Sequence, residues 1–166
     1  MTQIKLGDQV VDLSGSLPTI NSKAPDFLLA NNDLVNMTLK DFEGKRLVLN
    51  IFPSLATPVC SASAHKFNEL ASDMDNTVVI CISRDLAFSQ KQFCTSNNLD
   101  NVLFLSDMRN HDFASDYGVL HTNGKFQGLL ARSVVIINTD GLISYTQLLD
   151  QTGHEPNYDE VLDALI

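Results

Sequence analysis

The sequence has little positive charge. Its 166 residues include 11 lysines and arginines against 20 aspartates and glutamates, so the formal net charge at pH 7 is −9. Nucleic acids and anionic membrane surfaces are bound through a cationic protein face. The charge balance therefore argues against both partners, and we expect the protein to bind no nucleic acid and no membrane.

Cysteine is scarce as well, with three residues in the chain: Cys60, Cys81 and Cys94. No C-x-x-C or H-x₃-H pair occurs, so the spacing matches none of the usual zinc sites. The cysteine density is also too low for a small secreted domain that is stapled by disulfides.

Long apolar runs are missing too. The first residues of the chain contain no apolar core of a signal peptide, and no apolar stretch approaches the roughly 20 residues that span a bilayer. We therefore expect a cytoplasmic protein whose thiols are held reduced.

No repeat, low-complexity segment or linker interrupts the chain. A length of 166 residues suits one domain, so we expect a single domain over residues 1–166. Two short apolar runs around Gly7-Asp8 predict an N-terminal β-hairpin over about residues 1–15. The next segment, residues 16–26, contains two prolines and is expected to be a loop.

Apolar strand-like runs then alternate with helical patterns. We expect buried strands over residues 47–52, 77–82 and 102–105, paired strands over 133–138 and 142–148, and helices over 58–74, 85–95, 110–117 and 156–166. Buried strands alternating with helices predict an α/β fold with a parallel core. The late hairpin makes the sheet mixed, and helices on both of its faces make a three-layer sandwich.

Cys60 stands at the expected start of a helix. Thr57 is a favoured N-cap, and Pro58 is favoured at the first helical position and pushes Thr57 toward extended geometry. Cys60 is then the third helical residue. The N–H groups of the first turn lack intrahelical acceptors, and a helix N-terminus favours a thiolate. A thiolate of Cys60 can therefore accept hydrogen bonds from these groups.

The same helix has an apolar face with helical spacing, formed by Phe67, Leu70, Ala71 and Met74. Cys60 lies seven residues before Phe67 and thus about 20° away around the helix. The sulfur should face the sheet at the edge where open α/β sheets place their sites, partly shielded but reachable. On position alone, a cysteine that merely packs at a helix start explains the pattern equally well.

The residues around Cys60 resemble the active-site motif of the peroxiredoxins, P-x-x-x-(T/S)-x-x-C, with Pro53, Thr57 and Cys60 at the matching positions. Further segments resemble the bacterial thiol peroxidase subfamily, at residues 45–54, 66–68, 75–83 and 132–136. The likeness runs over nearly the whole chain. One departure is Pro58, where this subfamily often has glycine.

The resemblance implies a thioredoxin-like fold and a thiol-dependent peroxidase that acts in antioxidant defence without haem, flavin or metal. Cys60 would reduce hydrogen peroxide and organic hydroperoxides and become a sulfenic acid. Cys94 would resolve it as an intrachain Cys60–Cys94 disulfide, which thioredoxin reduces. Members of this family are commonly homodimers.

Three more residues receive a role from the resemblance, and each also has a structural explanation. Thr57 would contact the thiolate and the peroxide, or serve only as an N-cap. Pro53 would shield the site, or only end a strand. Arg132 would be the active-site arginine, or a solvated residue at a strand end. Attack by a thiolate on a peroxide does need a fixed cation, which favours the first reading of Arg132.

The other cysteines are weaker candidates for the nucleophile. Cys94 falls near a helix C-terminus, where the helix dipole disfavours a thiolate. Cys81 lies inside a buried strand and is expected to be an unreactive core thiol. Two alternatives stay open: a peroxidase in which Cys94 is idle, and a non-catalytic redox sensor.

Overall fold

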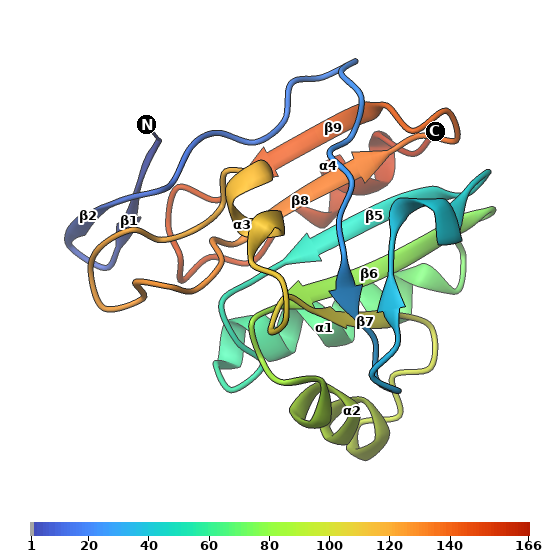
Figure 1. The fold of residues 1–166 in the computed structure, drawn as a ribbon, viewed down its shortest axis with the longest axis horizontal. Helices are drawn as coiled ribbons and strands as arrows, with labels where there is room; N and C mark the ends of the chain where they lie inside the picture. The colour runs from blue at the N-terminus through green and yellow to red at the C-terminus, as the bar shows by residue number, and fades with distance from the viewer. Residues whose placement is uncertain (1) are drawn as a thin grey trace.

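A seven-stranded mixed sheet forms the middle of the computed structural model, which describes residues 2–166 (Figure 1). Its strand order is β4-β3-β7-β6-β5-β8-β9. The strands are β3 (Leu29–Ala30), β4 (Asn36–Met37), β5 (Arg46–Ile51), β6 (Thr77–Ser83), β7 (Leu103–Ser106), β8 (Ser133–Ile137) and β9 (Ile143–Leu148). A separate hairpin of β1 (Gln3–Leu6) and β2 (Gln9–Asp12) confirms the expected N-terminal hairpin.

The helices fall within or close to the expected segments but are shorter. They are α1 (Pro58–Ala71), α2 (Ala87–Ser96), α3 (Asp112–Asp116) and α4 (Tyr158–Asp163). Helix α2 begins two residues later than expected because Leu86, its N-cap, is extended. Helix α1 ends at Ala71, where the chain enters a turn closed by the hydrogen bond from Met74 N to Ala71 O.

The sequence did not predict the structure between residues 27 and 45. Strands β3 and β4 have two residues each, and η1 (Leu39–Phe42) is a single 3₁₀ turn. Such short elements contain no complete period of hydrophobic alternation, so a pattern search does not find them.

The two faces of the sheet pack against different layers. On β5, Leu47, Leu49 and Ile51 belong to the core that holds α3 and the N-terminal hairpin, whereas Val48 packs with residues of α1 and α4. Helices α1, α2 and α4 cover one face, and α3 and the N-terminal segment cover the other (Figure 1). The expected three-layer sandwich with a mixed central sheet is therefore confirmed.

Strand pairing brings three chain segments to one edge of the sheet. Strands β5, β6 and β7 are parallel, and Ile51 at the end of β5 pairs with Ile82 of β6. Strand β8 runs antiparallel to β5, and its first residue, Ser133, also pairs with Ile51. Arg132, which precedes Ser133, therefore lies where β5 ends and the chain turns toward α1. Across residues 2–166, no helix is both long enough and apolar enough to cross a membrane.

Candidate active site

The loop of residues 53–57 connects β5 to α1, and Thr57 ends it as the N-cap. Thr57 has the expected extended geometry, with φ −97° and ψ 145°, and Pro58 occupies the first turn. The expected cap hydrogen bond is absent, however. The Thr57 hydroxyl donates to the Ser54 carbonyl oxygen at 3.0 Å, and Thr57 N donates to the same oxygen at 3.1 Å. The hydroxyl thus closes the turn of the 53–57 loop rather than capping the helix.

Cys60 lies on the buried face of α1. The buried residues of this helix are Cys60, Ser63, Ala64 and Phe67, which confirms the expected orientation toward the sheet. The thiol is fully shielded rather than partly shielded as expected, because Cys60 is 0% exposed. Its neighbours in an apolar cluster include Phe52, just beyond β5, and Leu55 of the 53–57 loop.

Arg132 is the basic group of the site. It is 2% exposed, so it is not a solvated residue at a strand end. Its Nη2 donates to Cys60 Sγ at 3.2 Å, and its Nε donates to the Thr152 carbonyl oxygen at 3.1 Å. Among residues 2–166, this arginine supplies the hydrogen bond to the Cys60 sulfur, in place of the first-turn N–H groups expected from the sequence.

The Arg132 guanidinium makes no ion pair with a carboxylate of the described residues. The nearby Tyr158 hydroxyl donates to Glu155 at 2.8 Å. Burial raises the pKa of Tyr158, the contact with Glu155 raises it further, and the charge of Arg132 opposes both. The buried nitrogen Nη1 of Arg132 has no acceptor within residues 2–166. The positive charge therefore lies against the thiol, and one of its N–H groups remains without an acceptor within residues 2–166.

Cys94 packs against the apolar cluster that contains Cys60. It lies in the last turn of α2, is half-buried, and donates from Sγ to the Leu99 carbonyl oxygen at 3.1 Å. Burial raises the pKa of the Cys94 thiol, and the neighbouring Asp100 raises it further. Cys60 and Cys94 are both free thiols here, and the raised pKa of Cys94 makes it a weak nucleophile.

Cys81 is a core thiol, as its place in a strand predicts. It is 0% exposed on β6 and accepts a hydrogen bond from Asn50 Nδ2 at 3.6 Å. Burial raises the pKa of Cys81 to about 12, an effect that the Asn50 contact only partly offsets. A thiol with such a pKa stays protonated at neutral pH and is inert.

Sequence reasoning missed the polar residues that hold the 53–57 loop. Asp85 accepts hydrogen bonds from the Ser54 hydroxyl at 2.7 Å and from Leu55 N at 2.8 Å. The available signal was a carboxylate two residues beyond a buried parallel strand, at the sheet edge where such folds place their sites. Within residues 2–166, no group of three or more His, Cys, Asp or Glu side chains could hold a metal ion.

Comparison with known proteins identifies the family. The Redoxin family matches residues 19–162. The chain belongs to the Redoxin family. This redoxin is 44% identical over 152 residues to a thiol peroxidase of Corynebacterium glutamicum, covering 92% of each chain. It is 43% identical over 165 residues to a thiol peroxidase of Mycobacterium tuberculosis, covering 99% of each chain.

Solved structures agree with this assignment. The redoxin superimposes on a peroxiredoxin-like protein of Aquifex aeolicus with a TM-score of 0.93 at 37% identity, over 99% of this chain and 96% of that one. A thiol peroxidase of Chromobacterium violaceum shares the fold, with a TM-score of 0.91 at 19% identity over 98% and 94% of the chains. The resemblance to the bacterial thiol peroxidases and the thioredoxin-like fold are thereby confirmed. The redoxin is a thiol-dependent peroxidase, which sets aside the non-catalytic sensor.

Proposed function

We propose that the redoxin reduces hydrogen peroxide and organic hydroperoxides with Cys60 as the nucleophile. The observation that carries this proposal is the 3.2 Å contact between Arg132 Nη2 and Cys60 Sγ. A guanidinium stays protonated throughout the physiological pH range, so it stabilises a thiolate at this distance. The unpartnered Nη1 suits the peroxide oxygen on which charge develops.

In the oxidation step, the proton that the Cys60 thiol gives up on ionising is the one that the leaving oxygen takes. The Cys60 thiolate attacks one peroxide oxygen, the S–O bond forms as the O–O bond breaks, and the other oxygen takes a proton and leaves as water or alcohol. The sulfur loses two electrons and becomes a sulfenic acid. Thr57, half-buried three residues before Cys60, has oxygen lone pairs left to accept from the peroxide. Pro53 is buried and helps to exclude water from the site.

The proposed second step is the formation of an intrachain disulfide. The Cys94 sulfur attacks the sulfenic sulfur of Cys60, the S–S bond forms and water leaves. The packing of Cys94 against the cluster around Cys60 supports this role. The contacts of Cys60 with Arg132 and of Cys94 with Leu99 must both break before the sulfurs meet.

A thioredoxin thiolate then attacks the disulfide, and the second thioredoxin thiol releases both cysteines in reduced form. The expected cytoplasmic location belongs to this proposal, because that compartment keeps thiols reduced. The expected homodimer belongs to it too. Two apolar side chains at the start of α2, Leu86 and Phe88, are 55% and 65% exposed and suit contact with a second copy.

The test is mass spectrometry of the reduced protein after one equivalent of hydrogen peroxide, with alkylation and peptide mapping. We expect a loss of two hydrogens that maps to Cys60–Cys94, with Cys81 free. Cys94→Ser should undergo one oxidation to the sulfenic acid and then lose thioredoxin-supported turnover, whereas the control Cys81→Ala should turn over normally. Normal turnover of Cys94→Ser would establish the mechanism in which Cys94 is idle.

A further inference from the structure

Asp85 lies just beyond β6, and its carboxylate accepts hydrogen bonds from the 53–57 loop. Oδ1 accepts from the Ser54 hydroxyl at 2.7 Å, and Oδ2 accepts from Leu55 N at 2.8 Å and from the Ser83 hydroxyl at 2.6 Å. The side chain is half-buried and makes no ion pair with a basic group of residues 2–166. Its negative charge is therefore satisfied by these three donors, two of which belong to the loop.

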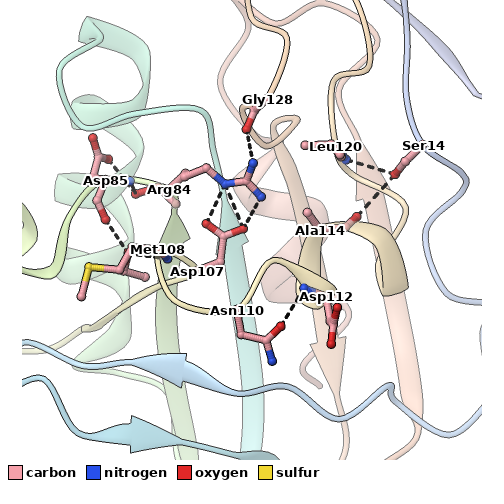
Figure 2. Close-up of polar contacts among 12 residues, drawn as sticks. Ser14, Arg84, Asp85, Asp107, Met108, Asn110, Asp112, Ala114, Leu120 and Gly128 are labelled. Carbon is pink, nitrogen blue, oxygen red and sulfur yellow. Dashed lines mark hydrogen bonds and ion pairs between the residues drawn. The ribbon is translucent and has the colours of Figure 1, made fainter.

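The backbone around Asp85 is held by contacts of Arg84 and of the Asp85 carbonyl oxygen. Arg84 pairs with the fully buried Asp107 at 2.7 Å and donates from Nη1 to the Gly128 carbonyl oxygen, as Figure 2 shows. The Ser106 hydroxyl donates to the carbonyl oxygen of Asp85 at 2.5 Å. Residues 84 and 85 are thus fixed to the end of β7 and to Gly128, and the Asp85 carboxylate in turn holds the 53–57 loop.

On the loop side, the hydrogen bonds continue to the helix start. Ser54 Oγ accepts from Ala56 N at 3.1 Å, and the Ser54 carbonyl oxygen accepts both donors of Thr57. Cys60 follows three residues later, in the first turn of α1. Asp85 therefore anchors the turn that sets where α1, and with it the Cys60 sulfur, begins.

On the other side, the hydrogen bonds reach the helix that carries Cys94. Gln90 of α2 is fully buried, and its Nε2 donates to Ser83 Oγ at 3.1 Å and to the Leu105 carbonyl oxygen at 3.0 Å. Gln90 lies four residues before Cys94, on the same face of the helix. A continuous chain of hydrogen bonds thus runs from α2 through Ser83 and Asp85 to the 53–57 loop.

We propose that Asp85 is a positioning residue that holds the 53–57 loop in the arrangement that reacts with peroxide and so opposes the local opening that disulfide formation needs. The inference rests on the proposed Cys60–Cys94 disulfide. Oxidation requires Cys60 to stay beside Arg132, whereas disulfide formation requires it to leave. The hydrogen bonds from Ser54 and Leu55 to Asp85, called the latch below, therefore favour the oxidation of Cys60 and oppose the formation of the disulfide.

Asp85→Asn tests this role because the amide has one acceptor oxygen in place of two and turns N–H donors toward the loop. A hydrogen bond to a charged group is worth about a tenfold change in an opening equilibrium. We expect oxidation of Cys60 by peroxide to slow and disulfide formation to accelerate, so that the ratio of the two rate constants changes about tenfold. Rapid quenching with alkylation and mass spectrometry resolves thiol, sulfenic acid and disulfide over time and yields both rate constants.

Hydrogen exchange of the Leu55 amide in the reduced protein gives an independent readout. This amide donates to Asp85, so it should exchange faster in the variant. Ser54→Ala, which removes one loop contact, should shift both rate constants in the same directions by a smaller factor. If Asp85→Asn does not fold, Ser54→Ala provides the test of the proposal.

Two control variants separate the latch from general effects. Asp33→Asn removes an exposed carboxylate that pairs with Lys91 of α2, so it matches the charge change. Gly141→Ala strains a left-handed glycine in the β8–β9 turn, with φ +79°, and so lowers stability away from the site. Both should leave the two rate constants at wild-type values.

Rate constants that change in opposite directions, with faster exchange at Leu55, support the latch. The proposal is overturned if both rate constants stay at wild-type values, if they change in the same direction, or if Leu55 exchange is unaltered. A wild-type protein that reaches the sulfenic acid but no Cys60–Cys94 disulfide overturns the proposed function instead. In that event the oxidation rate and the Leu55 exchange still decide whether Asp85 holds the loop.

Discussion

At the scale of the residue, the proposed chemistry depends on the shape of one cation. Arg132 reaches Cys60 with Nη2 while Nε holds the Thr152 carbonyl oxygen, which leaves Nη1 for a third contact. Lysine keeps the charge but cannot make these contacts from one rigid plane. We expect Arg132→Lys to lower the rate constant for Cys60 oxidation about 100-fold, the usual effect of removing one donor to a developing charge.

The measurement is the initial rate of thiol loss over a series of peroxide concentrations. Arg109→Lys is the matched control, because Arg109 is exposed and donates to Leu34 and Asn36 far from Cys60 in the sequence. A wild-type rate in Arg132→Lys would show that charge alone suffices and that the fork geometry has no part in catalysis.

At the scale of the element, one turn depends on a glycine. Gly118 follows α3 with φ +68°, and a Cβ at this position would lie 2.2 Å from the Ser16 carbonyl oxygen. Because the atom in the way is backbone, it cannot rotate aside. We expect Gly118→Ala to lower the free energy of unfolding by about 3 kcal/mol or more in urea titrations.

The control for this prediction is Gly44→Ala, which has φ +82° and open space around the added carbon. It should cost about 1 kcal/mol, the strain of the left-handed backbone alone. The difference between the two variants measures the close approach of the N-terminal segment to α3. Equal losses would mean that the segment moves aside without cost.

At the scale of the whole molecule, stability should depend on pH through His121. This side chain is 0% exposed, and neither ring nitrogen has a partner among residues 2–166. Burial lowers the pKa of His121 to about 4 from an ordinary value of 6.5. Below pH 6.5, His121 therefore binds a proton in the unfolded chain but not in the folded protein. The free energy of unfolding falls as the pH drops toward 4.

The size of the stability loss follows from the lowered pKa of His121. Between pH 6.5 and about pH 4, each pH unit changes the free energy of unfolding by about 1.4 kcal/mol. Between pH 7 and pH 5, the wild-type protein should lose about 2 kcal/mol more unfolding free energy than His121→Leu. His154→Gln, at an exposed position, should behave like the wild type. If the wild type and His121→Leu lose stability in parallel, the buried imidazole is not the cause.

The sequence predicts most of the fold because its helices and long strands contain full periods of a hydrophobic pattern. It predicts the position of Cys60 on the sheet side of α1 for the same reason, since the distance to Phe67 is local. The sequence does not predict the hydrogen bond of the Thr57 hydroxyl correctly. An N-cap threonine can accept from a first-turn N–H group or donate to a nearby carbonyl oxygen, and here it donates to the Ser54 carbonyl oxygen. The full burial of Cys60 was not predicted because it depends on packing with Phe52 and Leu55, which requires the folded loop.

The antiparallel pairing of β8 with β5 has a consequence for the nascent chain during synthesis. Cys60 and Arg132 are 72 residues apart, and they meet only when β8 has joined the sheet. A nascent chain that has left the ribosome as far as α2 carries both proposed redox cysteines but not Arg132, the cation proposed to stabilise the thiolate. The proposed peroxide chemistry would therefore begin only when β8 joins the sheet, and a chain still being synthesised would lack the arginine that the proposal requires.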